Sequence, residues 1–216
     1  MPEGSAFTGY TLLTGATGLV GSVLMRDMLL RGRRLAVLVR PKRRETAAER
    51  IDTLLQYWES RWQRRLERPI CLVGDVNDDH LGLTESDQQW LMRRCTRVIH
   101  GAAIVKFFAA GDQSEPWETN LEGTRRALEL CRRLGLREFH YVSTAYVCGR
   151  RLGVIRESDL EKGQSFRNDY ERSKYEAERL VRAAGFIAPA TIYRPVVIGG
   201  DSQTGYTNAY NGIYVY

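Results

Sequence analysis

Tyr170 and Lys174 are the pair of residues in this chain whose types and spacing are best suited to catalysis. They lie four positions apart in the stretch YERSK, so on a helix they share one face. A phenol has an ordinary pKa of about 10, and a neighbouring positive charge favours its ionised form. The spacing therefore predicts that Lys174 lowers the pKa of Tyr170 toward the range needed for proton transfer at neutral pH. A YxxxK match alone is also typical of an ordinary amphipathic helix start.

A pair of hydroxyls precedes these residues in the stretch YVSTAYVCG. Ser143 and Thr144 lie at the end of a predicted strand over 138–143. In open α/β sheets, ligands bind at the carboxyl ends of the strands. We therefore expect a hydroxyl here to hold a substrate carbonyl against Tyr170. Asn120, in NLEGT, is a helix-start or strand-bridging residue, and both a structural and a functional role are open.

Three glycines at intervals of three follow the first apolar run, in TGATGLVG. Gly15 is expected to form a tight turn, Gly18 to let the backbone approach a pyrophosphate, and Gly21 to pack the helix closely on the strand. The amides at the start of the following helix would then face the phosphates. A glycine triplet after a first strand and before a helix indicates dinucleotide binding.

The second predicted strand ends at Arg40, which is followed by Lys42, Arg43 and Arg44. NAD enzymes place an acidic side chain at this position to hold the ribose 2′-hydroxyl, whereas an arginine pairs with a 2′-phosphate. No Asp or Glu is expected within reach of Arg40. The sequence therefore predicts NADPH rather than NADH. The alternative is a solvated basic loop without a ligand.

Alternating strand and helix patterns position these residues. Strands are predicted at 10–14, 35–39, 70–73, 97–100, 138–143 and 190–198, and helices at 18–31, 45–66, 85–95, 118–134 and 169–184. The helix over 45–66 shows a core-facing stripe of Ala48, Ile51, Leu55, Trp58, Trp62 and Leu66. This alternation predicts an α/β fold with a doubly wound parallel sheet, the Rossmann fold.

Bulk composition fits one globular domain of 216 residues. Hydrophobic residues make up 43% and charged residues 27%, and no apolar run reaches the roughly 18 residues of a membrane span. The N-terminus lacks the pattern of a signal peptide, so a cytoplasmic location is expected. The net charge of +6 favours phosphates or acidic partners in general, and the basic runs lack the features of a nucleic-acid module. Four cysteines without ligand spacing predict reduced, buried thiols and no metal site.

The motifs together resemble a known superfamily. TGATGLVG, GDV, HGAA, NLEGT, VSTAYV, YxxxK and YRPVVIGG occur in the order and spacing of extended short-chain dehydrogenases/reductases, over nearly the whole chain from residue 9. The segments STAYV, YERSKYEAERLV and TIYRPVVIGGDSQTG are most similar to the thioester reductase group. That group includes fatty acyl-CoA reductases and the reductase domains of carboxylic acid reductases and peptide synthetases.

The resemblance implies a role for specific residues. Thr144, Tyr170 and Lys174 would form a catalytic triad with Tyr170 as proton donor. The residues implied to bind the cofactor are Gly15, Thr17, Gly18, Leu19, Gly21, Arg40, Asp75, Val76, Ala102, Ala103, Lys174, Pro195 and Val197. By this resemblance, the glycine loop would cradle the pyrophosphate, Asp75 and Val76 would flank the adenine, and Pro195 and Val197 would lie near the nicotinamide.

The resemblance also implies an activity: reduction of an acyl thioester, on CoA or on an acyl carrier protein, to an aldehyde or alcohol with NADPH. We expect one NAD(P)-binding domain over 1–216, with its core at 9–200 and the start of a truncated substrate-binding segment at 201–216. Two alternatives are a nucleotide-sugar epimerase, dehydratase or hydroxysteroid-type dehydrogenase of the superfamily, and a non-catalytic NADPH-binding protein. A homodimer through the long helices is open, because these helices pair in many relatives.

Overall fold

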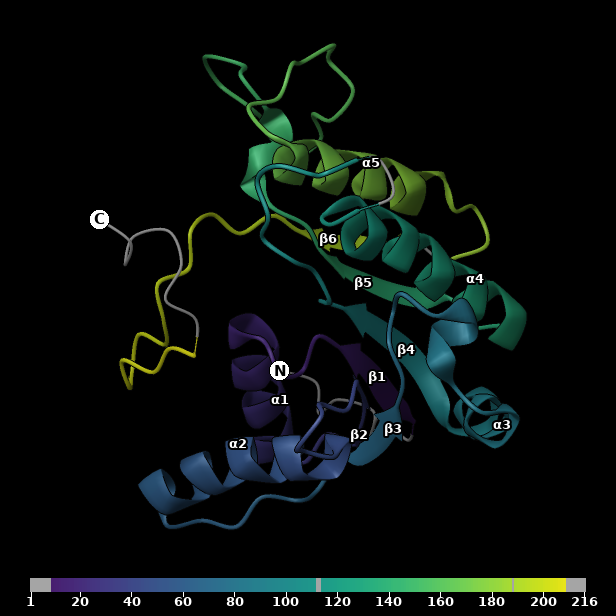
Figure 1. The fold of residues 1–216 in the computed structure, drawn as a ribbon, viewed down its shortest axis with the longest axis vertical. Helices are drawn as coiled ribbons and strands as arrows, with labels where there is room; N and C mark the ends of the chain where they lie inside the picture. The colour runs from purple at the N-terminus through teal and green to yellow at the C-terminus, as the bar shows by residue number, and fades with distance from the viewer. Residues whose placement is uncertain (1–8, 112–113, 188, 209–216) are drawn as a thin grey trace, which may run out of the picture.

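A six-stranded parallel sheet forms the centre of the computed structural model, which describes residues 9–111, 114–187 and 189–208 (Figure 1). The strands run in the order β3-β2-β1-β4-β5-β6, and every neighbouring pair is parallel. Their bounds are β1 (Tyr10–Thr14), β2 (Leu35–Val39), β3 (Ile70–Val73), β4 (Cys95–His100), β5 (Glu138–Val142) and β6 (Thr191–Tyr193). This order is that of a Rossmann fold, which confirms the predicted fold class.

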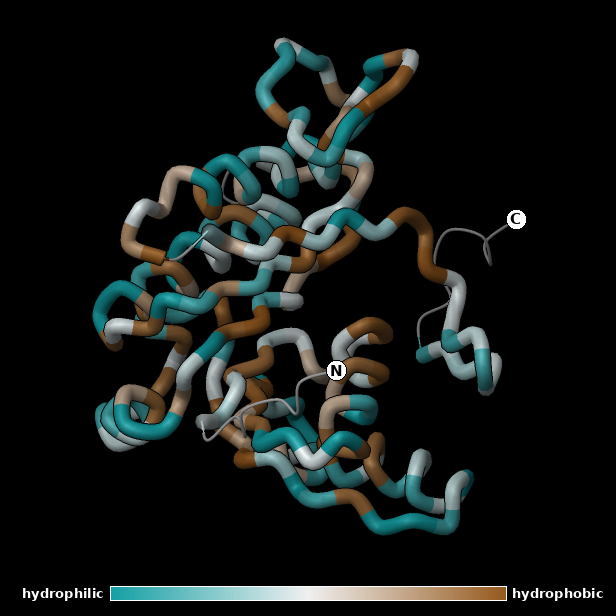
Figure 2. Tube along the Cα trace, turned by 180° about the vertical axis from the view of Figure 1, so that it is seen from behind, coloured by the Kyte–Doolittle hydropathy of each residue, from teal (hydrophilic) through white to brown (hydrophobic). Residues whose placement is uncertain are grey.

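Helices cover both faces of the sheet. Their bounds are α1 (Leu19–Leu30), α2 (Ala47–Trp62), α3 (Glu85–Arg94), α4 (Gly123–Leu134) and α5 (Asp169–Ala183). Helices α1 and α2 lie on one face, and α3, α4 and α5 lie on the other (Figure 1). Successive residues of β1 serve the two faces, since Leu12 belongs to the apolar cluster under α3–α5 and Leu13 to the cluster under α1 and α2. Figure 2 shows the hydrophobic colour recurring along the buried strands, with hydrophilic stretches on the outer helices.

The start of α2 shifts its predicted apolar stripe. Thr46 caps the helix in a reciprocal capping box with Glu49, so the helix begins at Ala47 instead of 45. Ile51, Leu55 and Trp58 are buried as predicted, but the first member of the stripe is Ala47, because Ala48 is exposed. Of the remaining predicted members, Trp62 is half-buried, and Leu66 is buried beyond the end of the helix.

Two further predicted elements differ clearly from those observed. The helix predicted at 118–134 is divided into a π-helical turn, Glu118–Glu122, and α4. The strand predicted at 190–198 ends at Tyr193, and its continuation leaves the sheet near Pro195. Proline lacks a backbone N–H and is poorly suited to a ladder. The Pro195 carbonyl instead accepts a hydrogen bond from the Ala145 amide at 2.9 Å.

The segment after β6 crosses back to the other end of the sheet (Figure 1). Asp201 forms a short ion pair with the buried Arg26 of α1. The ring of Tyr206 lies 4.8 Å from that of Tyr57 and 4.5 Å from that of Trp58, both on α2. Residues 201–208 therefore pack on α1 and α2. The rest of the predicted substrate-binding segment, 209–216, lies outside the described residues.

The cysteines are free thiols, of which Cys95 and Cys131 are buried and Cys71 and Cys148 are half-buried. No cluster of His, Cys, Asp and Glu suited to a metal ion occurs among the residues described. Within the same residues, no helix combines the length and the apolar character of a membrane span.

Candidate active site

A pocket of about 240 Å³ opens at the carboxyl ends of β1, β2, β3 and β4. The chain passes from β1 outward to β2 and β3, then returns to place β4 on the other side of β1. Such a switch point is where ligands bind in open α/β sheets. The pocket is lined by Gly15, Thr17, Gly18, Leu38, Val39, Arg40, Gly74, Asp75, Val76, Gly101, Ala102, Ala103, Ile104, Glu115 and Thr119.

The glycines form a backbone cradle on one side of this pocket. Gly15 has a φ of +76°, and a Cβ there would lie 2.6 Å from the backbone of Gly101. A Cβ on Gly21 would lie 2.0 Å from the carbonyl oxygen of Gly15, so Gly21 packs against the loop itself. Gly18 begins α1 without a side-chain cap, and the first turn of α1 carries no acidic residue. This arrangement fits a dinucleotide pyrophosphate, because backbone N–H groups at a helix start attract anions.

Arg40 and Asp75 lie together at the rim of the pocket. An Nη1 atom of Arg40 is 3.4 Å from Oδ2 of Asp75, and the Arg40 side chain is 63% exposed. The expectation that no acidic residue reaches Arg40 is therefore wrong. Residues 75 and 40 are far apart in the sequence, but β2 and β3 are adjacent in the sheet and bring their carboxyl ends together.

Arg50 is a neighbour of the pocket that the sequence reasoning missed. Its guanidinium donates hydrogen bonds to the Arg40 carbonyl and, at 3.1 Å, to the Thr17 hydroxyl. It thereby connects the glycine loop to the end of β2. Arg50 lies inside α2, ten residues beyond Arg40, and its place in an arginine-rich segment does not distinguish it from its neighbours.

The predicted catalytic hydroxyls meet at the carboxyl end of β5. Thr144 is buried, and its hydroxyl donates to the Pro195 carbonyl at 3.3 Å. Tyr170 lies in the first turn of α5, which Asn168 caps through the Glu171 amide at 2.9 Å. Burial raises the pKa of Tyr170, and a hydrogen bond with Thr144 partly offsets that rise. The structure thus differs from the prediction of a lowered pKa at Tyr170.

The orientation of Lys174 accounts for the raised pKa of Tyr170. Its ammonium donates to the Val142 carbonyl at 2.8 Å and lies 4.4 Å from the centre of the Tyr141 ring. The side chain is 2% exposed, and burial lowers its pKa to about 7, with Glu178 opposing the shift. The Lys174 ammonium is therefore bound to the end of β5, and burial is the main influence on the pKa of Tyr170.

Ser143 takes a different direction from Thr144. Its hydroxyl donates to Oε2 of Glu178 at 2.7 Å in the interior. Glu178 is fully buried and also binds Arg194, with a closest contact of 2.6 Å, and Arg182 at 2.9 Å. These partners hold the pKa of Glu178 below its usual value against its burial. Of the two predicted hydroxyls, only that of Thr144 reaches Tyr170.

Asn120 lies in the π-helical turn and bridges two segments. Its Oδ1 accepts from the Ile104 amide at 2.9 Å, and its Nδ2 donates to the Ile104 carbonyl at 3.1 Å. Nδ2 also lies 3.0 Å from the Ser173 hydroxyl on α5. Asn120 thus holds the segment after β4 against the helix that carries Tyr170 and Lys174.

The structure brings most predicted cofactor residues together. Those that line the pocket are Gly15, Thr17, Gly18, Arg40, Asp75, Val76, Ala102 and Ala103. The others lie outside its lining: Leu19, Gly21, Lys174, Pro195 and Val197. Among them, Val197 is exposed on the segment after β6, and Pro195 meets Thr144.

Comparisons with known proteins agree with this geometry. The sequence pattern of a family described as male sterility protein matches residues 13–216. The chain is 31% identical over 218 residues to the L-2-aminoadipate reductase large subunit of Penicillium chrysogenum, covering 91% of this chain and 15% of that protein. It is 31% identical over 215 residues to the isonitrile lipopeptide synthase of Streptomyces coeruleorubidus, covering 96% of this chain and 14% of that protein.

Solved structures show the same fold. The terminal R domain from the myxalamid biosynthetic pathway aligns with a TM-score of 0.81 and 32% identity, covering 98% of this chain and 55% of that one. A reductase domain of a nonribosomal peptide synthetase from Mycobacterium tuberculosis aligns with a TM-score of 0.71 and 26% identity, covering 93% and 50%. The chain thus spans about half the length of these solved domains and a small part of the curated relatives. It belongs to the male sterility protein family of NAD(P)-binding domains, within the extended short-chain dehydrogenases/reductases.

Proposed function

We propose that this protein is an NADPH-dependent reductase of acyl thioesters. The observation that carries the proposal is the position of Thr144, just after β5, and Tyr170, in the first turn of α5, on the same sheet edge as the dinucleotide pocket. Support also comes from relatives whose names describe reductases, among them the aminoadipate reductase. A solved relative with 26% identity is described as the reductase domain of a nonribosomal peptide synthetase, which favours a substrate carried on a thioester arm.

In this proposal the pocket residues bind the dinucleotide, which supplies the hydride when bound. The backbone at Gly15 and Gly18 would let the pyrophosphate approach closely, and Arg40 would pair with the 2′-phosphate. Asp75 is the present partner of Arg40, so a 2′-phosphate would compete with it for the guanidinium. Arg50 supports this exchange because it fixes the backbone of Arg40.

The triad acts on the carbonyl group of the substrate. The Thr144 hydroxyl would turn from the Pro195 carbonyl and donate, beside the Tyr170 hydroxyl, to the carbonyl oxygen of the substrate, where negative charge develops as the carbon is reduced. Tyr170 then gives its proton to that oxygen, which yields a hemithioacetal. Cleavage of its carbon–sulfur bond moves the hydroxyl proton to the departing sulfur, and the products are the aldehyde and the free thiol. A raised phenol pKa keeps Tyr170 protonated in readiness for this donation. Lys174 holds the end of β5 through the Val142 carbonyl.

Recognition of the acyl chain is assigned to residues from 201 onward, together with the apolar surface after β6. Val196, Val197 and Ile198 are exposed there. CoA and an acyl carrier protein present the same thioester arm, and the proposal covers both. Release of an aldehyde or of an alcohol depends on whether a second reduction follows the first.

The test combines binding and turnover on the whole chain. Fluorescence titration with NADPH and with NADH should show tighter binding of NADPH. When an acyl-CoA such as palmitoyl-CoA is added, the protein should oxidise NADPH and release the free thiol of CoA. Equal affinity for the two cofactors would overturn the role of Arg40. Cofactor binding without consumption, with acyl-CoA and with an acylated carrier protein, would instead favour a non-catalytic NADPH-binding protein.

A further inference from the structure

A chain of buried polar groups runs between the pocket and the catalytic helix, and His100 is at its centre. Nδ1 of His100 lies 2.9 Å from the Thr14 hydroxyl, and Nε2 lies 3.2 Å from the Thr124 hydroxyl. All three side chains are fully buried. Burying a polar group without a hydrogen-bond partner is costly, so each donor and acceptor in this series of buried groups must have a partner.

The cofactor-side end determines the direction of the first hydrogen bond. Oγ1 of Thr14 accepts from the Ala102 amide at 3.2 Å and from the Gly101 amide at 3.2 Å, which it shares with the Thr14 carbonyl oxygen. A hydroxyl has two acceptor lone pairs and one proton. With both lone pairs engaged, the Thr14 proton is left for His100, so Nδ1 of the ring accepts.

The catalytic-side end determines the second hydrogen bond independently. Oγ1 of Thr124 donates its proton to the Asn120 carbonyl at 2.7 Å. The Thr124 oxygen must therefore accept from His100, which places the ring proton on Nε2. Both ends require the same neutral tautomer, and burial together with the Lys174 charge lowers the pKa of His100 to about 3.

The chain continues from Asn120 to the catalytic helix. Nδ2 of Asn120 donates to the Ser173 hydroxyl at 3.0 Å, and this hydroxyl donates to the Tyr170 carbonyl at 3.0 Å. Asn120 and Ser173 are also fully buried. One run of hydrogen bonds thus links the Gly101–Ala102 wall of the pocket to the backbone of Tyr170.

We propose that His100 is a positioning residue: as the neutral tautomer with its proton on Nε2, it couples the wall of the cofactor pocket to the turn of Asn120 and, through Ser173, to Tyr170. The contribution to Tyr170 rests on the proposed reductase function. The tautomer and the support of the Asn120 turn stand on the hydrogen bonds alone. His100 touches neither substrate nor cofactor in this role.

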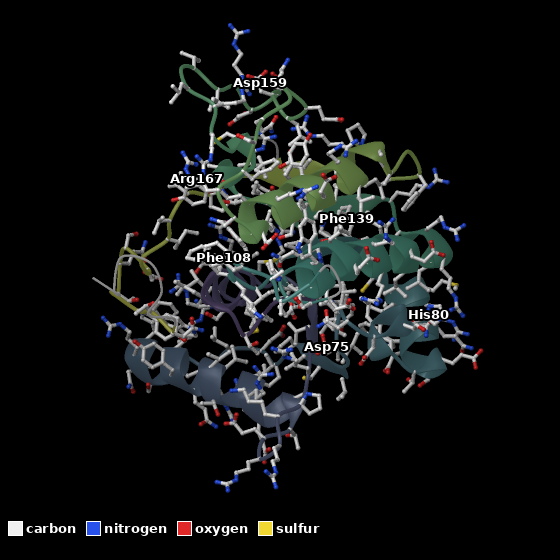
Figure 3. All side chains as sticks on the ribbon, turned by 45° about the horizontal axis from the view of Figure 1, so that its top comes forward. Asp75, His80, Phe108, Phe139, Asp159 and Arg167 are labelled. Carbon is white, nitrogen blue, oxygen red and sulfur yellow. The ribbon has the colours of Figure 1, made fainter. Side chains whose placement is uncertain are left out.

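The first test is the protonation state of His100 in the intact protein. Long-range nitrogen–proton NMR spectra of the labelled chain distinguish the two neutral tautomers and the charged form. The exposed His80 at the periphery provides an internal reference (Figure 3). We expect His100 to stay neutral with its proton on Nε2 between about pH 5 and pH 8. A proton on Nδ1, or a charged ring in this range, would overturn the proposal.

The second test measures the coupling with His100→Phe, which keeps a ring but removes both hydrogen bonds. The readout is hydrogen exchange of the Ile104 amide, which Asn120 holds. The matched control is Phe139→Leu, because Phe139 is buried with its ring 6.1 Å from that of His100 but has no part in the polar chain (Figure 3).

We expect exchange at Ile104 to rise about tenfold in His100→Phe and to stay within twofold of wild type in Phe139→Leu, under conditions where both remain folded. Equal increases of Ile104 exchange in the two variants would show that His100 contributes only packing, and they would overturn the proposed coupling. These readouts need no turnover, so they remain decisive if the reductase assay fails. In an active enzyme, kcat should fall about tenfold in His100→Phe with the KM for NADPH changed less than twofold, and a loss confined to KM would contradict positioning of Tyr170.

Discussion

The two halves of the site are built in different ways. Around β1 and β2, the pocket is formed by backbone and glycine, and its charged side chain, Arg40, is largely exposed. Around β5 and α5, the site is formed by buried side chains, and Lys174 is 2% exposed. A backbone cradle tolerates little added volume but depends little on side-chain chemistry. A buried polar cluster depends on the identity of each group, because every unpaired member is costly.

The strongest test of the catalytic half is Tyr170→Phe. This change removes the proposed proton donor but keeps the ring, so we expect thioester reduction to fall by roughly 10²–10⁴-fold. NADPH affinity should change little, since the phenol lies outside the lining of the pocket. The measurements are NADPH consumption with palmitoyl-CoA and fluorescence titration of the same preparation. Full activity in this variant would remove Tyr170 from the mechanism.

The cofactor half is tested by a matched pair of glycine substitutions. Gly15 and Gly135 have φ values of +76° and +68°, but only Gly15 faces backbone atoms, since the space around Gly135 is open. Gly15→Ala should lower the free energy of unfolding by about 2–5 kcal/mol and weaken NADPH binding. Gly135→Ala should cost about 1–2 kcal/mol and leave binding unchanged. Urea unfolding checks both values, and similar costs would show that the close approach at Gly15 is unimportant.

Cofactor choice is tested at the exposed charge of the pocket. Arg40→Ala should weaken NADPH binding by about tenfold to a hundredfold, the loss of one charge-assisted contact of about 1.5–3 kcal/mol. NADH binding should hardly change. The control is Arg44→Ala, which removes the same charge from an exposed neighbour that does not line the pocket. An equal loss in both variants would indicate general attraction by a basic loop.

The smallest expected effect is the pH dependence of stability from Lys174. Its folded-state pKa of about 7 lies below the ordinary value of 10.5, so between these values the unfolded chain binds more protons. The free energy of unfolding should therefore rise with pH above about 7, by roughly 1–2 kcal/mol between pH 7 and 8.5. This range ends below 9.0, the ordinary pKa of a thiol, because at higher pH the ionised thiols of the unfolded chain, such as those of Cys95 and Cys131, reverse the trend. Urea midpoints should lose this rise in Lys174→Met, and a persistent rise would assign it to another group.

Much of the fold followed from short-range patterns. The glycine loop after β1 and the strands at 10–14, 35–39 and 70–73 were predicted with their observed bounds. These features depend on neighbours in the chain, on apolar runs and on residues with special φ values. Element ends were less predictable, because the capping hydrogen bonds of Thr46 and the π-helical turn at Asn120 depend on individual side-chain geometry.

The sequence by itself determined that the chain is α/β, which loop forms the cradle, and that Thr144 and Tyr170 belong to one sheet edge. Only the tertiary structure decided which partners the charged side chains bind. Asp75 reaches Arg40 because β2 and β3 are neighbours, and Glu178 draws Ser143 away from Thr144 into the interior. The pKa of Tyr170 is raised although Lys174 lies four residues away, because burial of the phenol is the largest influence on it. Burial depends on all the groups packed around the side chain, which the sequence spacing does not reveal.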